Sequence, residues 1–242
     1  MTARPASRVQ TSLVSVIIPV YNGERYLAEA IDSAFAQEYR PLEIVVVDDG
    51  STDGSADIAR SYADVRYIHR PNGGPAAARN TGISASAGEF IAFLDHDDIW
   101  VSNKLSIEVE LLVTNSQLGC VMSRAQLFLD DLKEWPAWVT LGLEGAATLT
   151  HLQSALVVRR DAFTRIGLFD EKYRVAEDTE WLMRASDADI EITYMVPALL
   201  RRRVHSGNLS YRQDLARYFV VRAVHGSIQR QRARGRQEER QP

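Results

Sequence analysis

Three apolar runs in the first hundred residues constrain the fold more than any other feature of the chain. Residues 13–20 (LVSVIIPV), 42–47 (LEIVVV) and 90–94 (FIAFL) are nearly continuous and rich in β-branched side chains. Strands that are buried on both faces have this composition. Segments with helical apolar spacing lie between the runs, for example residues 24–37. This alternation predicts βαβ units, and therefore an α/β fold with a mostly parallel central sheet flanked by helices.

The remaining pattern predicts further elements around this sheet. Ser51 or Thr52 is placed to cap a short helix that includes Ile58 and Tyr62. Further along the chain, a glycine-rich loop and a helix of small residues occupy 71–88 (PNGGPAAARNTGISASAG). Strands are expected at 65–69, 118–123, 155–158 and 190–195, and helices at 103–113 and 161–166. Residues 124–150 show no regular pattern. No interior stretch has the composition of a linker, so we expect one main domain.

Length and composition restrict the class of protein. A chain of 242 residues with 45% hydrophobic and 25% charged residues is typical of a globular protein with one sizeable core. No apolar run approaches the roughly 18–20 residues that cross a bilayer, and the N-terminus has no apolar stretch of the kind found in secretory signals. The single cysteine, Cys120, excludes an internal disulfide. We therefore expect a cytoplasmic protein.

The net charge of −4 is distributed unevenly along the chain. From residue 200 to the end there are eleven arginines and three acidic residues, so this part carries +8 and the remainder −12. We expect a flexible N-terminus (1–12), a domain at 13–210 and a basic, helical or disordered tail at 211–242. A solvated helix end is the simple explanation of the tail. Peripheral contact with the inner face of a membrane is the functional one, and no nucleic-acid partner is predicted.

Polar side chains follow three of the predicted strands at the point where each strand ends. They are Tyr21 and Asn22 after the first, Asp48 and Asp49 after the second, and Asp95, Asp97 and Asp98 after the strand at 90–94. Ligands of open α/β sheets bind beyond these carboxyl ends. Crowded acids are costly unless cations or hydrogen-bond donors satisfy them, and oxygen ligands suit Mg²⁺ or Mn²⁺. The structural alternative is a tight turn in which Asp98 caps the next segment.

Several longer stretches match one known family in order and spacing. They are SVIIPVYNGERYLAEAIDSAFAQEY, EIVVVDDGSTDGS, GGPAAARNTGISASAGEFIAFLDHDDIW, GLFDE and AEDTEWLMR. From about residue 13 to about 210 the chain resembles family 2 glycosyltransferases, which have the GT-A nucleotide-diphospho-sugar transferase fold with a Rossmann-like sheet. Neither a G-x-G-x-x-G fingerprint nor a Walker A pattern is present. A nucleotide is therefore not expected to be held by either of those loops.

The resemblance implies a reaction. A single sugar, of hexosyl or N-acetylhexosaminyl type, would pass with inversion from a nucleoside-diphosphate sugar, by default a UDP-sugar, to a glycan, lipid-linked or peptide acceptor. The Q-x-x-R-W motif of processive members is absent, which favours addition of one sugar or a few in polysaccharide biosynthesis. Two other classes are less favoured. They are a catalytically silent nucleotide-sugar-binding protein of the same fold and a nucleotidyltransferase.

The resemblance also implies roles for individual residues. The nucleotide-sugar-binding residues would be Pro19, Tyr21, Asn22, Asp49, Arg79, Asp95 and His96. A metal, Mn²⁺ or Mg²⁺, would be held by Asp97, Asp95 and His205. Asp178 would be the general base, with Glu177 as the second candidate. From the sequence alone, Asp178 is equally well explained as a helix cap.

Two further groups of side chains could assist. Arg201, Arg202 and Arg203 could neutralise a diphosphate, although a solvated basic face is equally compatible with the pattern. The tryptophans Trp135, Trp138 and Trp181 could stack on sugar rings, although core packing is the more frequent role of such a side chain.

Overall fold

The computed structural model describes residues 12–136, 139, 147–148, 153–209 and 213–238. Its strands are β1 (Val14–Val20), β2 (Leu42–Asp48), β3 (Val65–His69), β4 (Phe90–Phe93), β5 (Ile99–Trp100), β6 (Leu118–Leu129), β7 (Ala147–Thr148), β8 (Leu156–Arg159) and β9 (Glu191–Val204). Its helices are α1 (Leu27–Phe35), α2 (Ser55–Ser61), α3 (Pro75–Ala85), α4 (Lys104–Thr114), the 3-10 turn η1 (Gln153–Ala155), α5 (Arg160–Ile166), α6 (Glu177–Asp187) and α7 (Gln213–Glu238).

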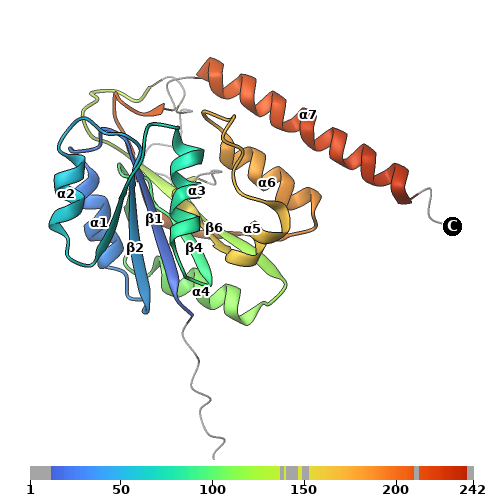
Figure 1. The fold of residues 1–242 in the computed structure, drawn as a ribbon, viewed down its shortest axis with the longest axis horizontal. Helices are drawn as coiled ribbons and strands as arrows, with labels where there is room; N and C mark the ends of the chain where they lie inside the picture. The colour runs from blue at the N-terminus through green and yellow to red at the C-terminus, as the bar shows by residue number, and fades with distance from the viewer. Residues whose placement is uncertain (1–11, 137–138, 140–146, 149–152, 210–212, 239–242) are drawn as a thin grey trace, which may run out of the picture.

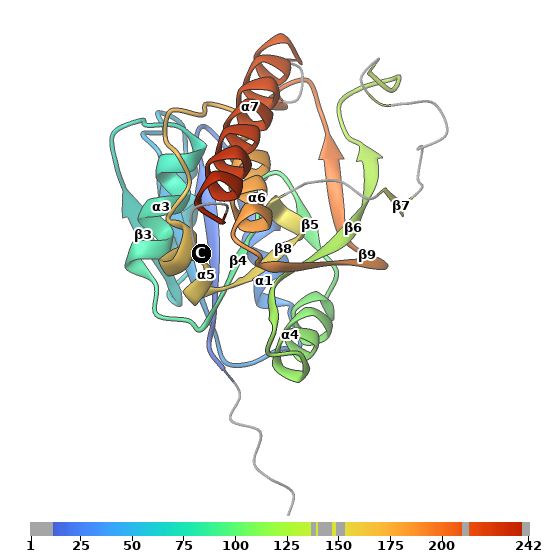
Figure 2. The ribbon, with the colours of Figure 1, turned by 90° about the vertical axis from the view of Figure 1, so that its right-hand side faces the viewer.

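The strands form one sheet in the order β3-β2-β1-β4-β8-β6-β9-β5, with β7 paired to β6 (Figures 1 and 2). Pairing is parallel across β3-β2-β1-β4, as the alternating pattern predicts. Beyond β4 the sheet is mixed, because β8 runs antiparallel to both β4 and β6 while β9 runs parallel to β6. The α/β architecture is confirmed. The parallel half also contains a topological switch, since the chain leaves β1 toward β2 and returns from β3 to β4.

Close packing explains the helix of small residues. α3 packs against β1, and a Cβ at Gly82 would lie 2.4 Å from Cγ2 of Ile17. Ala76, Ala77 and Ala78 on the same helix are buried. Only small side chains let the helix backbone approach the sheet this closely. The sequence PAAARNTGISA is therefore a consequence of how near α3 lies to β1.

Two expectations about local structure need correction. The strands at 118–123 and 190–195 extend to Leu129 and Val204, because β6 and β9 pair with each other well beyond their apolar beginnings. Polar residues interrupt the apolar pattern at those positions, so the pattern does not predict strands there. The expected capping of α2 by Ser51 or Thr52 is wrong, since the helix begins at Ser55, and Asp53 accepts that residue's N–H at 3.0 Å.

The long helix α7 follows the last strand and packs along α6 (Figure 1). No helix within the described parts of the chain is long and apolar enough to cross a membrane. Apart from Ser12, the predicted flexible N-terminus lies outside the described residues, as do Trp138 and the last four residues of the predicted tail.

Candidate active site

The loop after β1 is fixed to the loop after β2. Asn22 adopts a left-handed backbone conformation (φ 51°), which asparagine tolerates better than most residues. Its Oδ1 accepts the N–H of Thr52 at 2.8 Å, and its own N–H donates to Oγ of Ser51 at 3.0 Å. Pro19 is buried within β1, and Tyr21 is half exposed where the strand ends. These three predicted binding residues therefore lie at one end of β1.

Asp49, which follows β2 in the chain, binds the N-terminus of α3 through its carboxylate. Its carboxylate accepts the N–H groups of Gly73 at 3.0 Å and Gly74 at 2.7 Å, and Nη1 of Arg70 lies 3.2 Å away. Gly74 has a φ of 91°, so a residue with a Cβ would be strained there. The preceding Asp48 accepts the Tyr67 hydroxyl at 2.6 Å. Burial raises the pKa of Asp48, but hydrogen bonds from Tyr67 and Ser51 more than offset this and leave the pKa below its ordinary value.

Arg79 of α3 joins two acidic segments that lie far apart in the sequence. Its Nη2 donates to Asp95 at 2.5 Å, and its Nη1 donates to Glu177 at 2.6 Å. The whole residue is only 4% exposed. Both ends of the guanidinium group are therefore engaged by carboxylates. This geometry gives Arg79 a bridging position, in addition to which its nucleotide contact stays a prediction.

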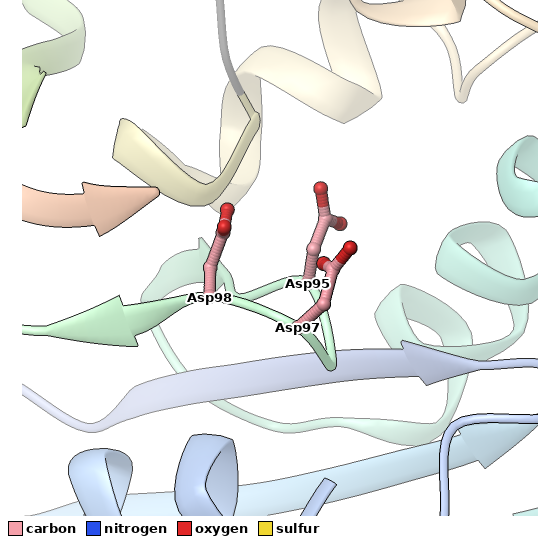
Figure 3. Close-up of side chains that lie close together, drawn as sticks. All are labelled: Asp95, Asp97 and Asp98. Carbon is pink, nitrogen blue, oxygen red and sulfur yellow. The ribbon is translucent and has the colours of Figure 1, made fainter. Parts of the chain in front are cut away.

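The acidic turn between β4 and β5 brings three carboxylates together (Figure 3). Asp95, Asp97 and Asp98 each have an oxygen within 4.8 Å of the others. Asp98 is buried and accepts the N–H of Arg203 at 3.2 Å. Burial and the adjacent charge of Asp97 raise the pKa of Asp98 well above its ordinary value. Asp98 is thus a structural member of the cluster, whereas Asp95 and Asp97 are partly exposed.

His205 lies beside Asp97, although 108 positions separate them in the sequence. Its Nε2 is 3.0 Å from Oδ2 of Asp97, and Nδ2 of Asn208 donates to the same oxygen at 3.0 Å. The N–H of Gly207 donates to Nδ1 of His205 at 3.2 Å, so in this conformation Nε2 carries the ring proton. Burial raises the pKa of Asp97, but the His205 hydrogen bond and nearby positive charges outweigh it, and the net pKa is lowered.

His96 occupies the middle of the acidic turn and lies against the loop after β1. A Cβ at Gly23 would come within 2.4 Å of Cδ2 of His96. The glycine therefore permits the imidazole ring to pack on the backbone of that loop. This contact joins the acidic turn to the segment that follows Pro19, Tyr21 and Asn22.

Glu177 and Asp178 form the first turn of α6. The helix starts after Ala176, which has a left-handed φ of 59°, so Asp178 is the second residue of the helix and not its N-cap. Burial is the largest influence on Glu177 and, with the charge of Asp178, outweighs Arg79 and raises the pKa of Glu177 to about 7. Burial also raises the pKa of Asp178, against the hydrogen bond from Thr179. Among the described residues, the hydrogen bonds to Asp178 all go to Oδ1.

Ser154, Asn208 and Arg203 support the acidic turn. The first two were not singled out from the sequence, and Arg203 was considered there only for a diphosphate contact or a solvated face. Oγ of Ser154 accepts the Asp95 N–H at 3.0 Å. The Arg203 guanidinium is buried, donates to the Asp97 carbonyl at 3.1 Å and pairs with Glu29 and Asp130. Arg203 is thus paired with protein carboxylates, whereas the sequence left a diphosphate contact and a solvated basic face equally open. No local motif marks such residues, because their partners lie on other elements.

Trp181 packs in the core, the role that the sequence analysis favours over stacking on a sugar. Its ring is fully buried, its Nε1 donates to the Gly167 carbonyl at 3.0 Å, and its ring centroid lies 4.9 Å from that of Phe163. Trp135 packs partly buried against Leu127, Val139 and Val204. Trp181 therefore belongs to the main core, and Trp135 packs at the edge of a smaller cluster.

The chain belongs to glycosyl transferase family 2, whose model matches residues 15–187. It is 32% identical over 211 residues to an uncharacterized glycosyltransferase of Rickettsia prowazekii (strain Madrid E), covering 82% of this chain and 66% of that protein. It is 35% identical over 195 residues to the uncharacterized glycosyltransferase EpsJ of Bacillus subtilis (strain 168), covering 72% and 56%. The chain thus spans two thirds or less of the length of these relatives.

Solved structures share the fold. One is S. aureus TarS 1–349 in complex with UDP, with a TM-score of 0.65 and 24% identity over 89% of this chain and 65% of that one. Another is the mannosyltransferase PcManGT from Pyrobaculum calidifontis in complex with GDP-Man and Mn²⁺, with a TM-score of 0.70 and 20% identity over 89% and 64%. The fold is therefore the GT-A fold, as the sequence motifs predict.

Proposed function

We propose that this chain transfers one sugar, with inversion, from a nucleoside-diphosphate sugar to a glycan, lipid-linked or peptide acceptor. The observation that carries the proposal is the Arg79 bridge, which holds the acidic turn and the Glu177–Asp178 pair against each other in one site. A UDP-sugar is the expected donor, which the UDP complex of the structurally similar TarS supports. The GDP-Man complex of PcManGT keeps a GDP-sugar in the test.

The acidic turn fits a divalent cation. Its carboxylate oxygens cluster within 4.8 Å, and hard oxygen ligands are those that Mg²⁺ and Mn²⁺ prefer. Asp97 and Asp95 would hold the ion, with His205 as the third ligand. When bound, the ion would stabilise the negative charge that develops on the leaving diphosphate. Asp98 is not assigned as a ligand, because it is buried and already accepts the Arg203 N–H.

Asp178 is the better general base of the acidic pair. Glu177 is committed to Arg79, whereas Oδ2 of Asp178 has no hydrogen bond within the described parts of the chain. In the proposed step the acceptor oxygen forms a bond to the anomeric carbon while the bond to the diphosphate breaks. The acceptor's proton passes to Asp178. Glu177 would position Arg79, and Arg79 would position Asp95.

The donor's nucleoside would lie at the ends of β1 and β2. Asp49 is proposed to contact the base, while Pro19, Tyr21 and Asn22 would form the wall of the pocket. The fixed hydrogen bonds of Asp49 support this role, because a carboxylate held by Gly73 and Gly74 presents one orientation to a ligand. His96, packed on Gly23, would lie nearer the sugar.

A panel of nucleotide sugars tests the proposal. The protein is incubated with each donor and Mn²⁺ or Mg²⁺, and release of nucleoside diphosphate is measured with and without EDTA. We expect slow release from one donor and its loss in EDTA. Asp178→Asn should keep donor affinity and lose transfer, while Glu180→Gln, a change two positions further along α6 at a side chain that pairs with Arg184, serves as the control. Donor binding without turnover under all conditions would favour the silent binding protein.

The role of His205 is separable from that of Asn208, because both side chains hold the same oxygen of Asp97 at 3.0 Å. If His205 binds the metal, His205→Ala weakens Mn²⁺ binding in calorimetry much more than Asn208→Ala does. Equal losses would mean that both residues act only by orienting Asp97.

We also propose a peripheral membrane contact for α7. Val220, Val224 and Ile228 recur at helical spacing and are exposed, and the exposed Arg217 and Arg232 flank them. Basic side chains gain about 1 kcal/mol each near an anionic surface. Sedimentation with phosphatidylcholine vesicles should therefore require added phosphatidylglycerol and weaken in high salt or on Arg217→Gln/Arg232→Gln. Equal recovery with neutral vesicles would contradict the contact.

A further inference from the structure

The segment that leads into α6 packs against α7. Tyr173, Phe219 and Ala223 form a buried apolar cluster, and Val175 and Ala176 pack against it. The rings of Tyr173 and Phe219 lie 5.2 Å apart between centroids. Ala176, at the junction, holds a left-handed conformation (φ 59°) that costs a non-glycine residue energy. Such a conformation persists only where the surrounding structure enforces it, and α7 is one part of that surrounding structure.

α7 is anchored to α6 at a second place, about three turns further along. Asp187, the last residue of α6, accepts hydrogen bonds from Ser227 at 2.8 Å, from Arg230 at 2.8 Å and from Gln231 at 2.9 Å. The position of Phe219 relative to Tyr173 is therefore set by the whole helix and not by one contact. Residue 187 is also where the match to the family model ends.

The same segment touches the loop beneath Asp49. Nη1 of Arg174 donates to the Gly73 carbonyl at 2.9 Å, and the N–H of Gly73 donates to Asp49. Residues 173–176 are thus held between the proposed nucleotide pocket on one side and α7 on the other. Glu177 and Asp178 follow directly. Any movement of this segment changes the distance between Asp178 and the Arg79–Asp95 pair.

We infer that α7 is a positioning element of the active site, and that Phe219 is its main positioning residue. Phe219 packs on Tyr173, in the cluster that also contacts Ala176. It thereby fixes the first turn of α6 so that Asp178 faces the donor site while Glu177 remains on Arg79. The inference rests on the proposed function, since it concerns the placement of the proposed base. It assigns a role in the site to a helix outside the family match.

The test compares three variants by two independent readouts. Phe219→Ala removes the ring, Phe219→Leu retains apolar volume, and Val221→Ala changes a residue of the same helix that is 68% exposed. Transfer kinetics give kcat and the donor KM. Hydrogen exchange, measured by mass spectrometry without substrate, reports the protection of residues 173–181 against that of β1 as an internal reference.

Phe219→Ala should lower kcat by about 10- to 100-fold, the effect of a misplaced catalytic group. The donor KM should stay within about twofold, because Asp49 keeps its hydrogen bond from the Gly74 N–H and Asp97 is held by His205 and Asn208. Exchange should accelerate in 173–181 and not in β1. Phe219→Leu and Val221→Ala should match the wild type in both readouts. If Phe219→Ala does not fold, Phe219→Val replaces it with the same criteria.

Unchanged exchange in 173–181 would overturn the inference, as would faster exchange there with kcat intact. A fall in kcat with an equal rise in KM would also overturn it, because that result indicates general loss of binding. A wild-type protein inactive with every donor would refute the proposed function alone. The exchange experiment would still decide whether α7 holds the segment.

Discussion

Replacing Arg79 with methionine should destabilise the protein in a way that depends on pH. The substitution keeps most of the volume of the side chain and removes a charge that pairs with Asp95 and Glu177. Removing one partner of a buried pair costs about 3–5 kcal/mol, because the other charge is left without compensation. The Arg79 and Glu177 side chains are 5% and 7% exposed, so their pair is buried. The Asp95 side chain is 33% exposed, so water screens the contribution of the Arg79–Asp95 pair to stability. We therefore expect a loss of about 3 kcal/mol at pH 8.

The loss should be smaller at pH 6. With Arg79 present, burial raises the pKa of Glu177 to about 7, so this carboxyl is mostly protonated at pH 6 and mostly charged at pH 8. Without Arg79 the pKa rises further, and the folded variant keeps the proton across this range. One pKa unit corresponds to about 1.4 kcal/mol, and the cost of Arg79→Met should therefore differ by about that amount between the two pH values.

Urea unfolding at pH 6 and pH 8 measures both quantities. Arg25→Met is the matched control, because Arg25 also pairs with two carboxylates but its side chain is 57% exposed. Its loss should stay below about 1 kcal/mol at either pH. The reasoning fails if Arg79→Met costs no more than Arg25→Met, or if its cost is the same at both pH values.

Three further outcomes are expected from the geometry. A carboxyl whose folded pKa is raised loses stability as pH rises through that pKa, so Glu177→Gln should flatten the fall in unfolding free energy between about pH 5 and pH 8; an unchanged slope in urea melts would contradict the pKa assignment. Gly82→Ala should lower the free energy of unfolding by about 1–3 kcal/mol, since its Cβ would meet Ile17. Gly235→Ala, with open space around it, should be neutral or slightly stabilising, and thermal melts of both variants measure the difference. Asp97→Asn should weaken Mn²⁺ binding in calorimetry far more than Asp98→Asn, because only Asp97 is proposed as a ligand, and similar losses would argue against that division.

The sequence predicts the parallel half of the fold because its central strands are continuous apolar runs, which can be identified one at a time. A strand buried on both faces needs a continuous apolar run, and the runs that form β1, β2 and β4 are visible without knowledge of their neighbours. The later strands β6 and β9 were predicted too short. Their second halves contain polar residues such as Arg124 and Arg202, and only the pairing between the two strands identifies them.

The site residues divide in the same way. The acidic turn is a cluster in sequence, so its carboxylates could be found directly. Arg79 was singled out, but its contact with Glu177 joins residues 98 positions apart, and no spacing rule connects them. Arg203 appeared to be one of three equivalent arginines, yet of the three only Arg203 is buried, in a network with Glu29 and Asp130. Whether a charged side chain faces a ligand or another side chain is decided by tertiary packing.

The carboxylates of the acidic turn are held by protein groups, and this determines how the protein should respond to metal removal. Each carboxylate of the turn already has a protein partner, since Asp95 pairs with Arg79, Asp97 accepts from His205 and Asn208, and Asp98 accepts the Arg203 N–H. Where a site does not form without its metal, metal binding and folding are one process. Here protein groups already hold the three carboxylates. We therefore expect the protein in EDTA to lose transfer but to stay folded. Saturating Mn²⁺ should add about 2.7 kcal/mol at 100 times its dissociation constant. Unfolding in EDTA, followed by circular dichroism, would show instead that the side-chain partners cannot stabilise the turn alone.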